Sequence, residues 1–257
     1  MDNMQMPLSL AVGATDQGRV KKSNEDNYVI NQRLGLCMVI DGMGGHDHGV
    51  MATQMIGDHF QSQLEQRLNH LKLNTKATDD DWVNQLDNVI SDTNLALYKK
   101  NQALGYSPGR GMGGVIAGLL WVETGRRAIV FHAGDSRLYR YRNQQLSQIT
   151  EDHSWYQQWL NQGRVGQAPA KNFVLRAVGP SDDVKADFQF VNFEDDDVIL
   201  ICSDGLTNMV SDSVLQEMIK GVACSEAFKE LPQAMIQRAN DEGGKDNITA
   251  IIIASDP

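Results

Sequence analysis

The sequence predicts an α+β protein in which strands and helices occur in separate blocks. Short runs rich in Val and Ile have the length of strands, and between them apolar residues recur with the spacing of one helix face. Because the blocks do not alternate strictly, this order favours layered antiparallel sheets over a doubly wound sheet. We expect strands near residues 8–14, 27–31, 35–40, 115–122, 127–133, 137–142, 187–192, 197–202 and 248–254.

Two long amphipathic helices are expected between the third and fourth strands. In the first, apolar residues recur at every fourth position from Ala52 to Leu68. The second follows the run Asp79–Asp81, which is typical of a helix start. A further pair is expected at about 211–221 and 225–240, before the last strand.

The composition is that of an ordinary globular protein with an acidic balance. Of 257 residues, 41% are hydrophobic, and 33 Asp and Glu face 23 Lys and Arg, giving a net charge of −10. Clustered cations are needed to neutralise nucleic-acid phosphates, so this charge argues against nonspecific nucleic-acid binding. The apolar runs fall short of the roughly 20 residues that span a bilayer. We expect residues 1–257 to form a single cytoplasmic domain that binds neither nucleic acid nor membrane.

The three cysteines are expected to be buried free thiols. Cys37, Cys202 and Cys224 are far apart and lack the C-x-x-C spacing of zinc or redox sites. Cys202 stands two residues before Asp204, which leaves a reactive role open.

Acidic residues stand at the ends of several predicted strands. Apolar strands lead into Asp41–Gly42 and Asp204–Gly205, whereas Glu25–Asp26 and Asp246–Asn247 precede strands and Asp135 lies in a turn between two. In antiparallel sheets the exit of one strand lies beside the entry of its neighbour, so these residues could meet at one edge. Such a cluster repels itself unless cations hold it, and carboxylate and carbonyl oxygens suit Mg²⁺ or Mn²⁺.

Other interpretations of these motifs are weaker or structural. A single Asp-Gly is usually only a turn, so the argument depends on its repetition. The glycines that follow Asp41 are not a phosphate loop, because no Gly-Lys-Ser/Thr follows them. His46 and His48 precede a helix and are expected to be capping or surface groups instead of metal ligands. The run Glu194–Asp197 is interpreted as a solvated turn before a strand.

Taken together, the motifs resemble the metal-dependent serine/threonine protein phosphatases of type 2C in their compact bacterial form. They occur in that family's order across nearly the whole chain. The resemblance implies a four-layer α-β-β-α sandwich, with two antiparallel sheets flanked by helix pairs and the metals at one end. The matching segments are TDQGRVKKSNEDNY (15–28), VIDGMGGH (39–46), GMGGV (111–115), HAGDSRLYRYR (132–142), ITEDHSW (149–155), NFVLRAVG (172–179), LICSDGL (200–206) and GGKDNITAI (243–251).

The resemblance also implies a ligand set for two Mn²⁺ or Mg²⁺ ions. Two cations roughly 4 Å apart make hydroxide available from a shared water near neutral pH, so no side-chain nucleophile is needed. Asp41 would bridge both ions, and the acidic ligands would act through that water. The remaining ligands would be Asp204 and Asp246 for one ion, and Glu25, Asp26 and the carbonyl of Gly42 for the other.

Two further residues take roles from the same resemblance. Asp135, together with Asp204, resembles the site of a weaker third ion seen in bacterial members. Asn247 would support the ligands without binding a metal itself.

Three departures from the family pattern affect substrate binding and packing. Lys21 stands where the family usually has an Arg that grips phosphate, so we expect Lys21 to bind phosphate less firmly, with Arg19 or Lys22 assisting. Gly113–Val115 replaces a common Gly-Thr-Thr, with an effect on sheet packing or on a hydrogen bond near the site. The segment at about 163–180, with Arg176 in its family position, corresponds to a mobile flap and is short, which would leave an open groove for folded phosphoproteins.

The resemblance predicts a hydrolase in signalling that removes phosphate from phosphoserine and phosphothreonine in proteins. A monomer opposing a serine/threonine kinase, and acting on that kinase and its substrates, is expected. One alternative is a noncatalytic interaction module on the same fold, which the intact set of acidic ligands disfavours. A second alternative, a metal enzyme for small phosphate esters or phosphotyrosine, stays open.

Overall fold

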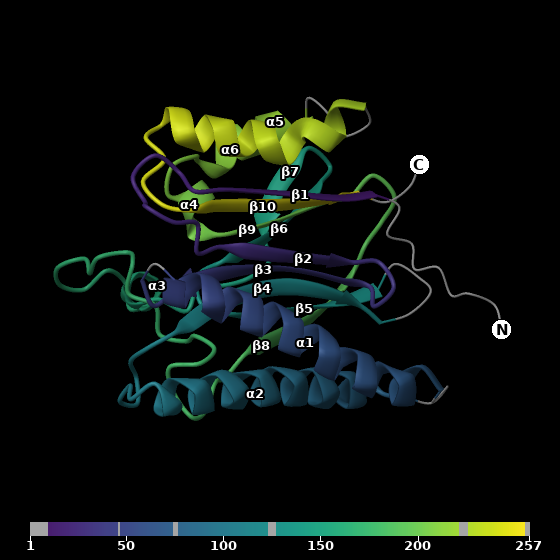
Figure 1. Cartoon of the computed structure of the whole chain (residues 1–257). Helices are drawn as coiled ribbons and strands as arrows, with labels where there is room; N and C mark the ends of the chain where they lie inside the picture. Colours follow the sequence, from purple (N-terminus) through teal and green to yellow (C-terminus); the bar gives the residue numbers. More distant parts are fainter. Residues whose placement is uncertain (1–9, 46, 74–76, 123–126, 221–225, 255–257) are drawn as a thin grey trace.

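Two antiparallel sheets stacked face to face form the centre of the molecule (Figure 1). The computed structural model describes residues 10–45, 47–73, 77–122, 127–220 and 226–254. One sheet contains, from edge to edge, β1 (Leu10–Asp16), β10 (Ile248–Ala254), β9 (Val198–Cys202), β6 (Arg137–Arg142) and β7 (Gln145–Gln148). The other contains β2 (Asn27–Asn31), β3 (Leu36–Met43), β4 (Gly113–Trp121), β5 (Arg127–Ala133) and β8 (Asp187–Asn192).

A pair of helices covers the outer face of each sheet (Figure 1). Helices α1 (Asp47–Leu73) and α2 (Asp79–Ala103) pack on the β2–β3–β4–β5–β8 sheet. Helices α5 (Asp212–Lys220) and α6 (Leu231–Asp241) pack on the other sheet. The predicted α-β-β-α sandwich is therefore confirmed.

The alternation of side chains along β3 explains why the sandwich has four layers. Leu36, Met38 and Ile40 belong to the core under α1 and α2. Cys37 and Val39, on the opposite face of the strand, belong to the core between the two sheets. Because both faces of the strand are buried, its sequence is a continuous apolar run instead of an alternating one.

Several elements differ from the sequence prediction. Strand β7 and the short helices α3 (Trp155–Asn161) and α4 (Asp204–Thr207) were not expected, because β7 is polar and the helices are too short to show periodicity. The helix predicted at 225–240 divides into a 3₁₀ turn, Glu226–Glu230, and α6, which has a proline in its first turn. Residues 8, 9, 221 and 225 of the predicted elements lie outside the described residues.

Burial accounts for the two cysteines that the structure describes. Cys37 and Cys202 are free and fully buried, as predicted. Burial raises the pKa of the Cys37 thiol to about 12 and raises that of Cys202 as well, which disfavours the reactive thiolate and the open role for Cys202. Cys224 lies outside the described residues.

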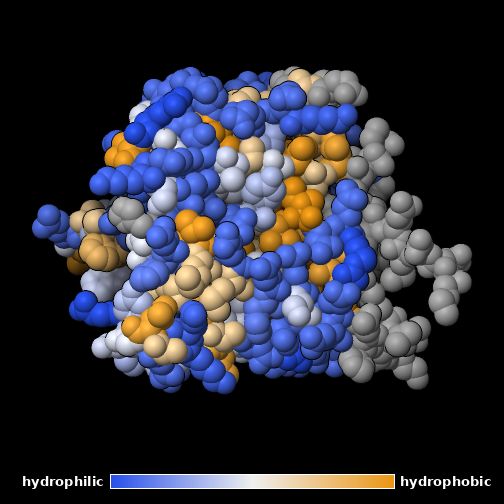
Figure 2. Space-filling model, in the orientation of Figure 1, coloured by the Kyte–Doolittle hydropathy of each residue, from blue (hydrophilic) through white to orange (hydrophobic). Residues whose placement is uncertain are grey.

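The surface and the helices agree with the composition. Hydrophilic residues cover most of the face seen in Figure 2, and apolar residues form separate patches on it. Among the described residues, every helix is too short or too polar to cross a bilayer.

The prediction of a solvated turn at Glu194–Asp197 was wrong for its last residue. Asp197 is only 3% exposed. Its two carboxylate oxygens accept hydrogen bonds from Nε and Nη2 of Arg142, at 2.7 and 2.6 Å. The turn is therefore fixed to β6 by a two-pronged ion pair between the half-buried Arg142 and the buried carboxylate of Asp197.

Replacing Arg142 by Leu should destabilise the protein by about 3 kcal/mol, because the buried Asp197 carboxylate would lose its charged partner and keep the N–H of Glu194 as a donor. Urea denaturation would measure the loss. Glu194→Gln is the matched control, since Glu194 also pairs with Arg142 but its side chain is 67% exposed; it should cost less than about 0.5 kcal/mol. Equal losses in the two variants would contradict this account.

Candidate metal centre

Five carboxylates converge at one end of the two sheets. Asp41 lies near the end of β3, Asp204 directly follows β9, and Asp135 lies in the turn between β5 and β6, while Asp26 and Asp246 precede β2 and β10. Burial raises the pKa of Asp41 well above its ordinary value, and the charges of the four other carboxylates raise it further. The structure therefore brings these predicted residues into one electrostatic cluster.

Strand register explains how distant parts of the chain meet there. Asn27 of β2 pairs with Ile40 of β3, which sets Asp26 beside Asp41. On the other sheet Ala250 of β10 pairs with Cys202 of β9, which places the residues before β10 next to Asp204. Stacking of the sheets then joins the two edges into one site.

Asp26 connects the two sheets directly. Its Oδ2 accepts hydrogen bonds from the hydroxyls of Ser203 and Thr249, both at 2.7 Å. These bonds favour the charged form, but burial outweighs them and raises the pKa of Asp26 to about 7. Neither partner could be recognised from the sequence beyond the position of Ser203 in the Ser-Asp-Gly motif.

Glu25 lies against a glycine at the start of α1. A Cβ added at Gly49 would come within 1.8 Å of Oε2 of Glu25, and one added at Gly42 within 2.3 Å of the Glu25 carbonyl oxygen. Both glycines therefore make room for this residue, and Gly49 was not recognised from the sequence. Because Gly42 has no side chain, its own backbone beside the cluster is not covered by one.

Asn247 fixes the loop that carries Glu25. Its Oδ1 accepts a hydrogen bond from the Glu25 N–H at 2.9 Å. Its Nδ2 donates to the carbonyls of Gln17 and Ser23, at 2.8 and 2.9 Å. One buried amide thus joins the β1–β2 loop to the start of β10, where Asp246 lies.

Lys21 points at the acidic cluster. Its Nζ lies 2.5 Å from Oδ1 of Asp246. Burial disfavours the charge of Lys21, but the bond to Asp246 and the nearby charges of Asp41 and Glu25 outweigh it and raise the lysine pKa. Lys21 and its neighbours Arg19 and Lys22 are all exposed, and of these three the Lys21 ammonium is the one that pairs with a candidate ligand.

Asp135 shares a small cavity with the flap, the name used here for residues 163–180. Burial, followed by the charges of Asp204 and Asp152, raises the pKa of Asp135 to about 7. A cavity of about 40 Å³ is lined by Asp135 and Asp204 and also by Lys171 of the flap. Asp135 and Asp204 therefore share this cavity with a residue of the flap.

His48 is engaged away from the carboxylates. Its Nδ1 lies 2.8 Å from the hydroxyl of Tyr106, and that contact fits a structural role at the start of α1. His46 lies outside the described residues.

The packing of Gly114 explains one of the two missing threonine side chains, since Gly113 stands at the family's own glycine and Val115 at the second threonine. A Cβ at Gly113 would come within 2.7 Å of Pro180, and one at Gly114 within 2.9 Å of Ile56. Gly114 also exchanges two backbone hydrogen bonds with Val178, at 3.0 and 2.9 Å. The glycines let the end of the flap pack closely on β4, so the departure concerns packing.

The donor set fits hard divalent cations. Every side chain in the cluster offers oxygen, and several carboxylates are buried where they cannot all be charged without a compensating cation. Such oxygen-only sites suit Mg²⁺ or Mn²⁺. The predicted ligands are therefore compatible with the ions that the motifs suggested.

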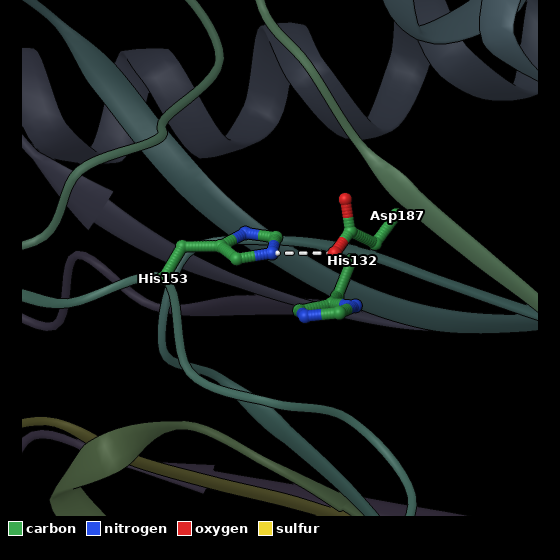
Figure 3. Close-up of side chains that lie close together, drawn as sticks. All are labelled: His132, His153 and Asp187. Atoms are coloured by element: carbon green, nitrogen blue, oxygen red, sulfur yellow. Dashed lines mark hydrogen bonds and ion pairs between the residues drawn. The ribbon is translucent and has the colours of Figure 1, made fainter. Parts of the chain in front are cut away.

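A second group of metal-ligand types lies outside this cluster and was not predicted. His132, His153 and Asp187 bring ligand atoms within 4.8 Å of one another (Figure 3). The two imidazole rings are stacked, with centroids 4.3 Å apart and planes 16° from parallel. Stacked rings do not direct their lone pairs at a common point, and Nη1 of Arg176 already binds Asp187 at 2.5 Å. This arrangement is a hydrogen-bonded cluster and not a metal site.

Comparison with known proteins agrees with this geometry. The family model described as protein phosphatase 2C matches residues 15–252. The serine/threonine phosphatase stp of Listeria monocytogenes serotype 4b is 31% identical over 252 residues, covering 94% of both chains.

Two solved structures are similar over nearly the whole chain. PppA, a key regulatory component of T6SS in Pseudomonas aeruginosa, has a TM-score of 0.80 and 28% identity, covering 96% of this chain and 97% of that one. The catalytic domain of the serine threonine protein phosphatase PstP, in complex with two manganese ions, has a TM-score of 0.76 and 28% identity, with 95% and 97% coverage.

Gly49→Ala should weaken Mn²⁺ binding at least about tenfold, because the new Cβ would displace the Glu25 carboxylate. Gly57→Ala in the same helix is the matched control: its Cβ would have its nearest neighbour at 3.5 Å. Titration calorimetry would compare the two. Alanine stabilises a helix relative to glycine by up to about 1 kcal/mol, so a loss of affinity without a loss of stability would identify the steric cause. Unchanged affinity in Gly49→Ala would remove Glu25 from the ligand set.

Mn²⁺ should raise the melting temperature more at pH 8 than at pH 5. Without metal, Asp26 and Asp135 have pKa values of about 7 in the folded protein, above the ordinary carboxyl value, so folding binds protons and stability is lost as pH rises towards 7. Metal binding removes that loss because the ligands are then charged and compensated. We expect the metal-free melting temperature to fall by about 4 °C or more between pH 5 and pH 8. An Mn²⁺ effect of equal size at both pH values would contradict this.

Proposed function

Because this chain belongs to the protein phosphatase 2C family and is a metal-dependent serine/threonine protein phosphatase, we propose that the acidic cluster around Asp41 is its hydrolytic centre. The convergence of five carboxylates at one end of the sandwich is the observation that carries this proposal. The two manganese ions in the related PstP structure support it.

We assign the predicted ligands to two ions. Asp41 lies centrally, since the four other carboxylates all act on it, and this supports a bridging role. Asp135 would hold a weaker third ion with Asp204, which the cavity that both residues line supports. Besides Asp41, the ligands would be Asp204 and Asp246 for one ion, and Glu25, Asp26 and the Gly42 carbonyl for the other.

The mechanism divides the work between the bound ions and the chain. When bound, Mn²⁺ or Mg²⁺ supplies hydroxide from water near neutral pH and offsets the charge of the phosphoryl group. Ser203 and Thr249 hold the Asp26 carboxylate in place, and Asn247 holds the loop of Glu25. Direct hydrolysis by water, without a phosphoenzyme intermediate, is part of the same proposal.

Lys21 is proposed to bind the substrate phosphate. Its ammonium lies against Asp246, and a phosphate arriving at that ligand would meet the same positive charge. A lysine supplies one point charge where an arginine would supply a two-pronged fork. We therefore expect Lys21 to bind phosphate more weakly than an arginine would, and with less dependence on the orientation of the phosphate.

The substrate is proposed to be phosphoserine or phosphothreonine in a protein, placed there by an opposing kinase. A groove of about 450 Å³ beside the flap supports a polypeptide substrate; its lining includes Met43 at the end of β3, Gly109 and residues 174–177. A single catalytic domain over residues 1–257, acting as a cytoplasmic monomer, is part of the same proposal and rests on the family resemblance.

Phosphate release from a phosphothreonine peptide should depend on Mn²⁺ and fall at least about 100-fold in Asp204→Asn, because the amide cannot replace the charge of the ligand. A phosphotyrosine peptide and an aryl phosphate, assayed alongside, decide the substrate class. Mn²⁺ binding without turnover of any of the three would indicate a noncatalytic module instead.

Lys21→Ala should raise KM for the phosphopeptide about five- to tenfold and change kcat little, because one charged contact to phosphate is lost. Lys21→Arg should restore or improve the wild-type KM. Lys22→Ala is the matched control, since Lys22 is the neighbouring exposed lysine. An unchanged KM in Lys21→Ala would assign phosphate binding to another residue.

A further inference from the structure

The groove beside the flap begins at the end of β3, close to the acidic cluster. Its volume is about 450 Å³, which is within the range of roughly 300–1,000 Å³ found for pockets that hold small ligands. The groove therefore has room for one side chain of the size of Leu or Phe. Its apolar lining residues are Met43, Val174, Leu175, Ala177, Pro180 and Val184.

The alternation of side chains along β3 aligns the groove with Asp41. Cys37 and Val39 face the space between the two sheets. Side chains alternate along a strand, so Asp41 and Met43 lie on that same face. Two residues of a strand span about 7 Å. The groove is therefore continuous with the acidic cluster and begins one such step away from Asp41.

Two glycines shape the groove on the side opposite Met43. Met43 pairs with Gly113 of β4, and a Cβ at Gly113 would come within 2.7 Å of the Pro180 ring. The N–H of Gly109 donates to the carbonyl of Pro180 at 2.8 Å, and a Cβ at Gly109 would meet nothing within 4 Å. Gly113 thus lets Pro180 approach Met43, and Gly109 holds Pro180 without filling the groove.

Both walls of the groove are held by residues outside it. Asn94 of α2 accepts a hydrogen bond from the N–H of Gly179 at 2.7 Å and donates to the carbonyl of Ser181 at 3.0 Å. On the other wall, the N–H of Leu175 donates to the carbonyl of His153 at 2.7 Å. A groove whose walls are already ordered loses little conformational entropy when a side chain enters it.

The charged residues of the groove favour neither sign of charge. Arg176 lines the groove, but its Nη1 binds Asp187 at 2.5 Å. Asp183 and Lys185 are exposed and carry opposite charges, which salt screens. Val184 between them is buried, with 7% of its surface exposed. The groove therefore selects by apolar contact and not by charge.

We propose that this groove is a subsite for a bulky apolar side chain of the substrate, two residues away from the phosphorylated one. The inference rests on the proposed function, because it places the phosphoryl group at the acidic cluster. In an extended chain, side chains two positions apart lie on the same side and about 7 Å from each other. This spacing matches that of Asp41 and Met43, so a phosphoryl group at the cluster brings such a side chain to the groove.

Phosphothreonine peptides that differ in one residue would test the subsite. A single Leu is placed in turn at each position from −4 to +4 of a peptide that otherwise has Ala there. Leu at −2 or +2 should raise kcat/KM about tenfold over Ala. The gain should lie in KM, because an apolar contact is equal in the ground state and the transition state. Lys or Glu at the same position should stay within about twofold of Ala.

Two variants connect this preference to the groove. Ala177→Phe fills the groove, and Leu175→Ala removes part of one wall. In both, the ratio of kcat/KM for the Leu and Ala peptides should fall from about ten to below about three. Phe173→Ala is the matched control, because Phe173 is a 59% exposed apolar residue of the flap outside the groove lining; its ratio should equal that of the wild type. Partial unfolding would not change this ratio, since both peptides meet the same enzyme sample.

Equal kcat/KM for all peptides, or a Leu preference that is strongest at another position, would overturn the inference. A ratio that stays at the wild-type value in both Ala177→Phe and Leu175→Ala would overturn it as well. Turnover of phosphothreonine peptides without a Leu preference contradicts this inference alone, whereas absence of turnover for every peptide contradicts the proposed function.

Discussion

Mutual repulsion among buried carboxylates is the constraint on which the rest of this structure depends. Asp41, Asp26, Asp135 and Asp204 lie where burial and neighbouring charges raise the pKa of each. Without cations, these carboxylates can stay close to one another only if they are protonated. Keeping them protonated near neutral pH lowers the stability of the folded protein. Oxygen-binding divalent ions relieve the same repulsion, so the fold and the chemistry have one requirement in common.

The sandwich withstands this repulsion because its two sheets are joined at the site itself. The Asp26 carboxylate, at the edge of one sheet, accepts hydrogen bonds from Ser203 and Thr249 on the other. Asn247 joins the loop of Glu25 to the start of β10.

Local patterns could predict the strands and the acidic residues that end them, but not the partners that hold those residues. Asp41 and Asp204 follow apolar runs. The pattern of those runs and the position of each aspartate can be read directly from the sequence. Thr249 meets Asp26 across 223 positions of the chain, and Gly49 is explained only by the nearby Glu25 carboxylate. Asp197 was misplaced for the same reason: a run of acidic residues indicates a solvated turn until Arg142 is seen beside it. Contacts between distant positions decide such cases, and no single segment carries their signal.

Diffraction at the manganese absorption edge, from crystals grown with Mn²⁺, would test the central claim most directly. The account predicts two strong anomalous peaks on either side of the Asp41 carboxylate, one shared with Asp204 and Asp246 and the other with Glu25 and the Gly42 carbonyl. A weaker third peak is expected between Asp135 and Asp204. Absence of density around Asp41, or a peak at the His132, His153 and Asp187 cluster instead, would contradict it.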